Sequence, residues 1–180
     1  SRIETDCPKK SLGNRTPLIK KAKGLTVFIQ TVGKPRLVGP PVLVKPQRNG
    51  IVRLNAHLAS PVGSRLRYEP QPDKNTLGFW TDEEDYAEWM FRVNKSGKYR
   101  VEILQGCGDG QDGSTIAIEV GDKQLKYKVK ETGHFQTFEQ RKVGTFTIDS
   151  TEPQTLRLVV LKKMDRIIAD IRSIELIPLN

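Results

Sequence analysis

Two neighbouring segments of the chain alternate between apolar and polar residues, and this pattern restricts the fold more than any other feature. The odd-numbered residues from 87 to 93 are all apolar, and so are residues 99, 101 and 103. A period of two is typical of β-strands that bury one face. Because only a short connection carrying Gly97 separates the two segments, we expect them to pair as an antiparallel hairpin.

Similar short segments recur through most of the chain, separated by turns that carry Gly, Asp or Pro. The sequence predicts strands at 51–55, 65–69, 77–80, 86–93, 98–105, 114–120, 123–129, 143–148, 154–161 and 168–177. Gly121 and Asp122 predict a tight hairpin between the two strands that flank them. No segment combines a helical period with caps at both ends. We therefore expect an all-β protein, built as an antiparallel sandwich or barrel.

Charge divides the chain into two parts. Residues 1–50 hold 11 Lys and Arg against 2 Asp and Glu, whereas residues 51–180 hold 19 of each kind. This asymmetry predicts a basic N-terminal arm at 1–50 and a neutral domain at 51–180. Within the arm, residues 25–32 have high strand propensity, and the prolines between 35 and 46 indicate an extended connector or an edge strand.

The cysteines and the hydropathy give weaker information about where the protein acts. Cys7 and Cys107 lie in different parts of the chain, so either a disulfide fastens the arm or both remain thiols. No run of 18 apolar residues occurs, and we expect no membrane span. Nucleic-acid binding is disfavoured because the domain is neutral and its aromatic residues are not interleaved with basic ones.

Several strings in the domain stand in an order known from one group of modules. They are Leu77-Gly-Phe-Trp80, Asp85-Tyr-Ala-Glu-Trp89, Gly97-Lys-Tyr99 and Asp170-Ile-Arg-Ser-Ile174. With these strings, residues 51–178 resemble the galactose-binding-like β-sandwich of family-6 and family-35 carbohydrate-binding modules. The resemblance implies an antiparallel jelly-roll β-sandwich.

A second set of strings is similar to the C-terminal accessory domains of planctomycete-type bacterial sulfatases and α-L-fucosidases. It comprises Tyr68-Glu-Pro70, Lys74-Asn-Thr-Leu-Gly-Phe-Trp-Thr81, Leu104-Gln-Gly-Cys-Gly108 and Thr132-Gly-His-Phe-Gln136. This resemblance implies a non-catalytic, extracytoplasmic module, periplasmic or secreted. Such a module would target a glycan-degrading system to polysaccharide, with sulfated or fucosylated glycan as its ligand.

The candidate sugar-binding residues come from two loops. Trp80 precedes the acidic turn 82–85, where its ring would stack on a sugar at a loop rim; the alternative is a core tryptophan, as we expect for Trp89. His134, Phe135 and Gln136 combine an apolar ring with hydrogen-bonding groups, although His134 would equally suit a turn cap. Asn75 and Gln105 are further candidates, through the resemblance alone.

The resemblance also implies a structural Ca²⁺, which in the related modules is bound partly by a Glu near the first strand. The matching stretch here is Leu54-Asn-Ala-His57, and an imidazole is a poor ligand for a hard cation. Asp170 remains as the candidate remnant of that site, and we expect no other cofactor.

The chain shows no pattern typical of an enzyme. The acidic run Asp82-Glu-Glu-Asp85 suits a solvated turn better than a catalytic pair, because such pairs usually come from separate elements. The Gly-rich segment 105–114 leads into a predicted strand, which argues for a hairpin loop instead of a phosphate site. No nucleophile elbow and no zinc-ligand spacing occur. The alternative function is an assembly domain that docks on a partner protein through the basic arm.

Overall fold

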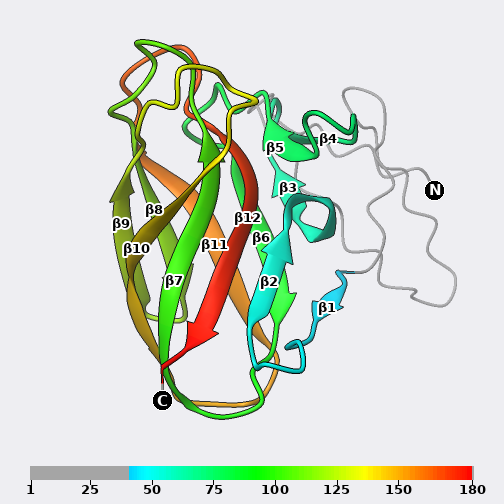
Figure 1. Cartoon of the computed structure of the whole chain (residues 1–180). Coiled ribbons are helices and arrows are strands. Elements are labelled where there is room, and N and C mark those ends of the chain that lie inside the picture. Colours follow the sequence, from blue (N-terminus) through cyan, green and yellow to red (C-terminus); the bar gives the residue numbers. More distant parts are fainter. Residues whose placement is uncertain (1–40, 180) are drawn as a thin grey trace, which may run out of the picture. The chain divides into compact units, whose positions relative to one another are not determined.

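The computed structural model describes residues 41–179, which form two six-stranded sheets packed face to face (Figure 1). The strands are β1 (Leu43–Val44), β2 (Val52–Asn55), β3 (Ser60–Val62), β4 (Arg67–Glu69), β5 (Thr76–Gly78), β6 (Tyr86–Phe91), β7 (Gly97–Gly106), β8 (Thr115–Val120), β9 (Lys123–Lys128), β10 (Glu139–Ile148), β11 (Gln154–Lys162) and β12 (Asp170–Pro178). The helical content of the described residues is one short 3-10 turn, η1 (Ala56–Leu58). No helix in this part of the chain is long and apolar enough to cross a membrane. The strand predicted at 25–32 lies outside the described residues.

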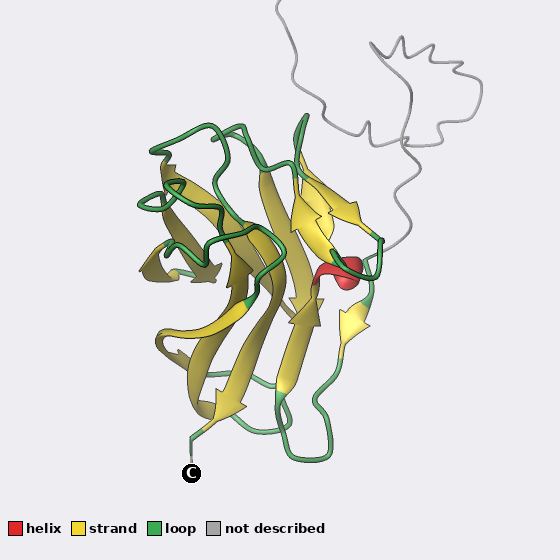
Figure 2. Cartoon of the chain, turned by 45° about the horizontal axis from the view of Figure 1, so that its top comes forward, coloured by secondary structure: helices red, strands yellow, loops and turns green. Residues whose placement is uncertain are grey.

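The strand order confirms the predicted all-β jelly-roll sandwich. The first sheet runs β1-β6-β11-β8-β9, with β3 also paired to β6, and the second runs β10-β7-β12-β5-β4, with β2 also paired to β12. All of these pairs are antiparallel except β1 with β6, which is parallel. Strands make up nearly all the regular structure, as Figure 2 shows.

The core lies between the two sheets and is filled by the alternating apolar residues of the sequence. In β6, Ala87, Trp89 and Phe91 are buried, and in β7 the residues Val101 and Ile103 are buried in the same way. Burial of such side chains removes apolar surface from water and is the main favourable contribution to folding. The indole Nε1 of Trp89 donates to the carbonyl oxygen of Asn55 at 2.9 Å, which satisfies its single polar group. Trp89 is therefore a core tryptophan, as predicted.

The predicted hairpin between residues 86–93 and 98–105 is wrong. β6 belongs to the first sheet, where it pairs with β1, β3 and β11, whereas β7 lies in the second sheet between β10 and β12. The connection therefore passes from one sheet to the other instead of reversing within a sheet. Alternation shows only that each strand buries one face, and here both faces enter the same core from opposite sides.

The second predicted hairpin is confirmed. β8 and β9 pair antiparallel, with Val120 opposite Lys123, so Gly121 and Asp122 form the two-residue connection. Gly121 has a φ of +60°, a left-handed conformation that glycine adopts without steric cost. This turn is where the sequence signal for local pairing is strongest, because the loop length fixes the strand register.

The remaining differences concern strands with weak sequence signals. β3 was not predicted. It contains Pro61 and lies beside β6 at the edge of the first sheet, where a missing N–H is tolerated. β10 begins at Glu139, four residues before the predicted start at residue 143. The prediction missed these residues because they are polar and because an irregularity between Lys142 and Gly144 interrupts the alternation. β1 falls within the range assigned to the arm, so that range includes one strand of the sandwich.

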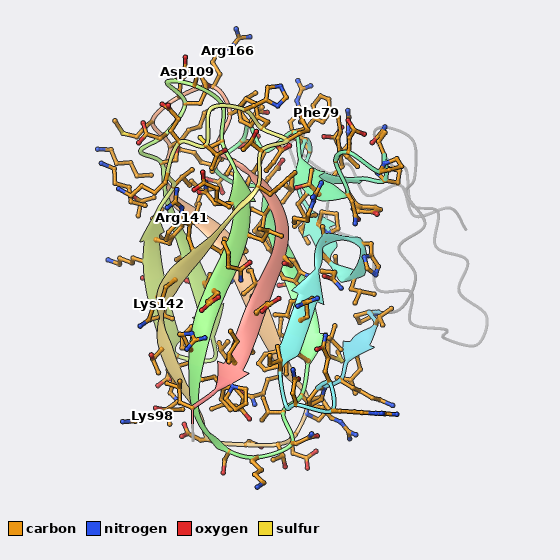
Figure 3. All side chains as sticks on the ribbon, viewed as in Figure 1. Phe79, Lys98, Asp109, Arg141, Lys142 and Arg166 are labelled. Atoms are coloured by element: carbon orange, nitrogen blue, oxygen red, sulfur yellow. The ribbon has the colours of Figure 1, made fainter. Side chains whose placement is uncertain are left out.

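Four connections meet at one end of the sandwich, at the top of Figure 1. They follow β5, β7, β9 and β11, and hydrogen bonds join them in pairs. The amide of Ile168 donates to the carbonyl oxygen of Trp80 at 2.8 Å, and the amide of Thr132 donates to that of Cys107 at 3.0 Å. Figure 3 shows Phe79, Asp109 and Arg166 at this end, with Lys98 at the opposite one.

Candidate functional site

Trp80 does not lie at the loop rim where the sequence placed it. Its side chain is fully buried, at 0 % exposure, and its Nε1 donates to the carbonyl oxygen of Asp85 at 2.9 Å. A ring in this position cannot stack on a sugar, so Trp80 is corrected to a core residue. The neighbouring Phe79 is 45 % exposed instead. Its φ of +56° interrupts the extended backbone, and for this reason alternation could not show which of the two rings faces out.

A small pocket of about 140 Å³ opens beside the Phe79 ring at this end of the sandwich. Its walls combine apolar groups with hydrogen-bonding groups, and they come from four separate parts of the sequence. The lining residues are Glu69, Phe79, Thr81, Phe135, Gln136, Ile167 and Asp170. Aromatic rings that border a few convergent polar groups are typical of a small-ligand site.

Phe135 packs against two glycines, Gly106 at the end of β7 and Gly108 in the loop that follows. A Cβ at Gly108 would lie 2.6 Å from Cε2 of Phe135, and a Cβ at Gly106 would overlap the carbonyl oxygen of Phe135. Neither site has room for a larger residue without a shift of the loop. The string Leu104-Gln-Gly-Cys-Gly108 therefore provides the surface against which Phe135 packs.

Two carboxyl groups form the polar side of the pocket. Glu69 at the end of β4 and Asp170 at the start of β12 are 7 % and 4 % exposed. A Cβ at Gly78, in the intervening β5, would overlap Oε2 of Glu69 and would lie 3.3 Å from Oδ1 of Asp170. Both carboxyl groups thus approach the same glycine, which leaves them the space to do so.

Burial and the charge of Glu69 raise the pKa of Asp170 to about 7, while the Lys74 ammonium and the Gln136 amide act in the opposite direction. The largest cause is burial, because a desolvated carboxylate is less stable than its neutral acid. At neutral pH, Asp170 is therefore present in both forms. It accepts hydrogen bonds in one form and donates one in the other.

Two cations stand beside the exposed ring. The guanidinium of Arg67 lies 3.5 Å from the centroid of the Phe79 ring, and the ammonium of Lys74 lies 5.9 Å from it. Lys74 also contacts Oε1 of Glu69 at 3.0 Å. Arg67 covers one part of the ring by a cation–π contact and helps to hold it in place. Neither Arg67 nor Lys74 is among the residues that line the pocket.

The structure separates the other predicted binding residues. Phe135 and Gln136 both line the pocket. His134 is exposed, and its Nδ1 accepts a hydrogen bond from the backbone N–H of Gln136 at 3.2 Å. This is the turn-capping role considered as the alternative. Asn75 is exposed and its Oδ1 accepts the hydroxyl of Tyr68 at 2.8 Å, outside the pocket lining.

Gln105 is corrected from a binding residue to a structural one. Its side chain is fully buried. Its Nε2 donates to the carbonyl oxygen of Lys130 at 2.5 Å, and its Oε1 accepts the Lys130 amide at 3.1 Å and the Tyr127 hydroxyl at 3.3 Å. These bonds join β7 to the end of β9, and Gln105 is not among the residues that line the pocket.

The sequence did not identify Phe79 or Glu69 as pocket residues, and it proposed Asp170 only as a metal ligand. Phe79 stands in the same string as Trp80, but Trp80 was assigned to the loop rim because it lies just before the acidic turn. Glu69 belongs to Tyr68-Glu-Pro70, whose Pro at position 70 marks the end of β4. The signal that would have found Asp170 is its place at the start of the last strand, beside the loops that carry Phe79 and Phe135.

The residues around Asp170 do not fit a calcium site. Ca²⁺ prefers six to eight oxygen ligands, usually with several carboxylates. Here Glu69 is the single carboxylate partner, and its other oxygen contacts the Lys74 ammonium. Residues 41–179 contain no group of three or more His, Cys, Asp or Glu side chains placed to hold a metal ion. Asp170 is therefore better described as a wall of the pocket.

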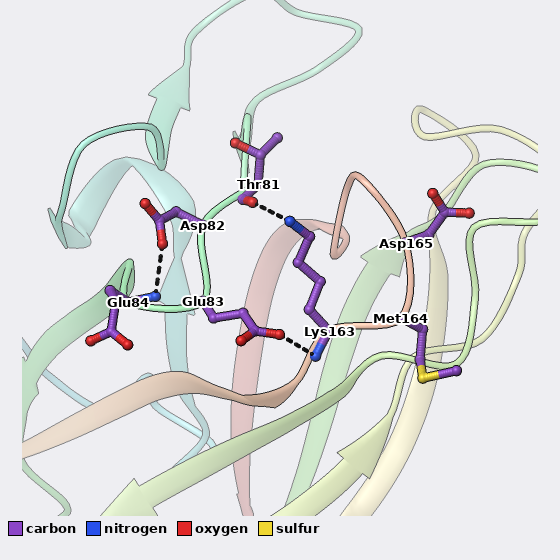
Figure 4. A pocket seen from close by; sticks show the side chains of 7 residues that line it. All are labelled: Thr81, Asp82, Glu83, Glu84, Lys163, Met164 and Asp165. Atoms are coloured by element: carbon purple, nitrogen blue, oxygen red, sulfur yellow. Dashed lines mark hydrogen bonds between the residues drawn. The ribbon is translucent and has the colours of Figure 1, made fainter.

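A larger polar groove of about 460 Å³ lies beside the acidic turn (Figure 4). Its lining residues are Thr81, Asp82, Glu83, Glu84, Lys163, Met164 and Asp165. Glu83 accepts the Lys163 amide at 2.9 Å, and the Lys163 ammonium donates to the carbonyl oxygen of Thr81 at 2.6 Å. These contacts bind one loop to another, and the groove has no aromatic ring on which a sugar could stack.

The fourth acid of this turn is not solvated. Asp85 is buried, and its carboxylate accepts the backbone amides of Ser64, Arg65 and Leu66 at 2.7–2.8 Å. The run is a turn, as predicted, but Asp85 is a structural cap within it. Cys107 is also buried, and burial with nearby acids raises the pKa of its thiol to about 11. Its predicted alternative partner, Cys7, lies outside the described residues.

Solved structures with the same fold include carbohydrate-binding modules. The C-terminal family-6 module of LamC, a marine laminarinase from Zobellia galactanivorans, matches with a TM-score of 0.56 and 16% identity, over 71% of this chain and 99% of the module. A family-35 module from Clostridium thermocellum matches with a TM-score of 0.55 and 12% identity, over 72% and 98%. The insecticidal crystal protein Cry2Aa matches at 0.55 with 15% identity over 71% of this chain, which spans only 21% of that protein. At these identities the likeness shows a shared fold.

Sequence comparison places the chain more directly. No curated protein matches it. The family model described as "Domain of unknown function (DUF5077)" matches residues 65–177. This range begins just before β4 and ends within β12, so it includes every residue that lines the pocket. The match covers more than half of the sequence, and the chain therefore belongs to the DUF5077 family.

Proposed function

We propose that this protein is a non-catalytic carbohydrate-binding module that takes a sugar in the pocket between Phe79 and Phe135. The observation that carries the proposal is the composition of that pocket. Two phenyl rings border it, and the carboxyl groups of Glu69 and Asp170 and the Gln136 side chain form its polar side. Sugars present apolar C–H faces and hydroxyl edges, and this combination suits both.

Binding would divide between ring contacts and hydrogen bonds. The exposed part of Phe79 offers a flat apolar surface, and Phe135 adds a second aromatic side chain to the lining. Carboxylate oxygens accept hydrogen bonds from hydroxyls, and a protonated carboxyl or an amide can donate one in return. The site needs no bond-making step, and its polar groups serve to orient the sugar.

The fold supports this proposal, because modules named for carbohydrate binding match nearly their whole length to this chain. The larger role we propose follows the resemblance to sulfatase- and fucosidase-associated domains. In that role the module acts outside the cytoplasm and brings a glycan-degrading system to its polysaccharide. The residues that line the pocket lie in or next to the connections that follow β5, β9 and β11, at the loop end of the sandwich.

Glycan-array screening followed by isothermal titration calorimetry tests the proposal. Phe79→Ala and Phe135→Ala should each weaken binding of the best glycan by about tenfold or more, because aromatic anchors usually dominate such contacts. Tyr86→Ala is the matched control, since Tyr86 is also an aromatic ring under an arginine, with Arg157 4.4 Å from its centroid, but it does not line the pocket. A chain that binds no glycan, or a Phe79→Ala variant that binds like the wild type, would contradict the proposal.

A further inference from the structure

The negative charge of the two carboxyl groups on the polar side of the pocket is only partly balanced by nearby cations of the described residues. Glu69 has the Lys74 ammonium 3.0 Å from its Oε1. Within the described residues, no Lys, Arg or His nitrogen lies within 4 Å of the Asp170 carboxylate. Asp170 is nevertheless buried, with an exposed fraction of only 4 %, and it lines the pocket. The polar side of the pocket therefore contains two buried carboxyl groups, and only one of them has a cation in contact among the described residues.

Gly78 brings these acids together. Because Gly78 has no side chain, Oε2 of Glu69 and Oδ1 of Asp170 both approach its Cα position, and a Cβ there would meet both. Two like charges that converge away from water repel strongly, so one of the pair tends to keep its proton. A third negative charge placed above them would meet the same repulsion.

We propose that this carboxyl pair, Glu69 and Asp170, makes the Phe79 and Phe135 pocket selective for uncharged sugars and excludes sulfated and uronic acid sugars from it. The inference rests on the proposed function and specifies the ligand class of the same site. A neutral sugar can donate hydroxyls to a carboxylate and accept a hydrogen bond from the protonated acid. A sulfate or a uronate brings an anion toward the Asp170 carboxylate, which has no cationic nitrogen within 4 Å among residues 41–179.

The cations near the site do not reverse this preference. Arg67 lies against the Phe79 ring, outside the residues that line the pocket, and Lys74 is already paired with Glu69. An anionic group would share the Lys74 ammonium with Glu69. Of the two ligand classes that the sequence resemblance implies, sulfated glycan is therefore the one that this pocket disfavours.

The direction in which the pKa of Asp170 is shifted agrees with the geometry. Burial and Glu69 raise its pKa to about 7, and Lys74 and the Gln136 amide lower it. Asp170 is also one of the nearby acids that, together with burial, raise the pKa of the Cys107 thiol. Near neutral pH the pair thus already holds a proton for part of the time, and a bound anion would increase that fraction.

Matched glycans test the selectivity. The probes are pairs of oligosaccharides with one backbone, unmodified in one member and sulfated or oxidised to a uronic acid in the other. The wild-type protein should bind the neutral member about tenfold more tightly or better, and Asp170→Asn should reduce that ratio to about threefold or less. Equal binding, or preference for the charged member, overturns the selectivity while leaving the proposed function standing. Absence of binding to every probe overturns both.

The pairing of the two acids can be measured without any ligand. Carbon-detected NMR titration of the Asp170 carboxyl should give a midpoint near the value of about 7. Glu69→Gln should lower that midpoint, because it removes the neighbouring negative charge. Glu175→Gln is the control: Glu175 lies on the same strand and pairs with Arg53 at 2.6 Å, so its removal should leave Asp170 unchanged. A midpoint below about 5 in the wild type, or no response to Glu69→Gln, overturns the inference.

Discussion

The exposed ring of Phe79 is held by a backbone conformation that costs free energy. Its φ of +56° lies in the left-handed region, which residues with a bulky side chain rarely adopt. Such strain amounts to about 1–3 kcal/mol and is often found where a side chain serves a ligand. Here it coincides with the ring that borders the pocket and carries the Arg67 contact.

A pair of substitutions separates the strain from the ring. Phe79→Ala and Phe79→Gly both remove the phenyl group, but only glycine tolerates a positive φ without steric cost. We expect Phe79→Gly to have a free energy of unfolding about 1 kcal/mol higher than Phe79→Ala, measured by urea denaturation. Both variants should lose glycan binding. Equal stability of the two variants would show that residue 79 is not strained in solution.

Asp170 should make the stability of the protein depend on pH. Its pKa is about 7 in the folded chain, against 3.8 for an aspartate surrounded by water, as in the unfolded chain. Between these values unfolding releases a proton, so the free energy of unfolding falls as pH rises from about 4 to 7 and stays low above that. The upper limit of this loss is about 4 kcal/mol.

Asp170→Asn should remove this contribution. Urea denaturation of the variant and the wild type at several pH values between about 4 and 8 measures the difference, and other carboxyl groups cancel in the comparison. The stability of the variant relative to the wild type should rise across this interval. A difference that is constant with pH would mean that Asp170 has an ordinary pKa in the folded protein.

At the scale of single elements, one arginine connects β12 with the connection between β4 and β5. Nε of Arg172 donates to the carbonyl oxygen of Lys74 at 3.0 Å, and Nη2 donates to that of Asp73 at 2.6 Å. Its guanidinium also lies 3.7 Å from the centroid of the Phe138 ring. Because Lys74 contacts Glu69 in the pocket, Arg172 is a positioning residue for the candidate site.

Arg172→Lys keeps the charge but loses the planar donors that reach both carbonyl oxygens. We expect a free energy of unfolding about 1–2 kcal/mol lower and glycan binding several-fold weaker. The control is Arg157→Lys, because Arg157 also lies over a ring, that of Tyr86, but on β11 in the other sheet. Calorimetry and urea denaturation of both variants provide the comparison. Unchanged glycan binding in Arg172→Lys would remove Arg172 from the site.

The elements also show what the sequence could predict and where it stopped. The fold class followed from alternation, because burial of one strand face is a local pattern. Pairing of β6 with β7 did not follow, since the same pattern fits two strands of one sheet or of two facing sheets. The hairpin at Gly121 and Asp122 was predicted correctly because a two-residue turn leaves only one choice of partner strand.

The candidate site was predictable only in the part that lies within one loop. Phe135 and Gln136 could be proposed from their own composition, and both line the pocket. Glu69 and Asp170 are far apart in the sequence and meet through β5, so their proximity depends on sheet order. The left-handed backbone at Phe79 reversed the choice between the two neighbouring rings. Long-range pairing and one unusual dihedral angle therefore account for the missed residues.

At the scale of the whole molecule, the excess positive charge belongs to residues 1–50, whereas the rest of the chain is balanced. Long-range attraction of anionic polysaccharide is an effect of net charge and weakens with salt. Selectivity inside the pocket depends instead on contacts that salt screens less. The two effects should therefore separate in experiment.

A chain that starts at Pro41 keeps β1 and loses most of the basic residues of the arm. We expect it to bind neutral oligosaccharide as the intact chain does, and to lose salt-sensitive association with sulfated polysaccharide. Titration calorimetry at about 50 and 500 mM salt distinguishes the two contributions. If the shorter chain instead loses neutral-sugar binding, the pocket is not sufficient. Discrete complexes with a partner protein that need residues 1–40 would favour the assembly role.

The hydrogen bond from Ile168 to Trp80 joins two of the connections that border the pocket, and the bonds between Thr132 and Cys107 join two others. Loops fastened in this way have little freedom left to lose when a ligand arrives. A sugar should therefore meet a rim that is already shaped, and its entry should cost little ordering entropy. Crystals grown without saccharide and crystals soaked with it should then show the same backbone around Phe79 and Phe135.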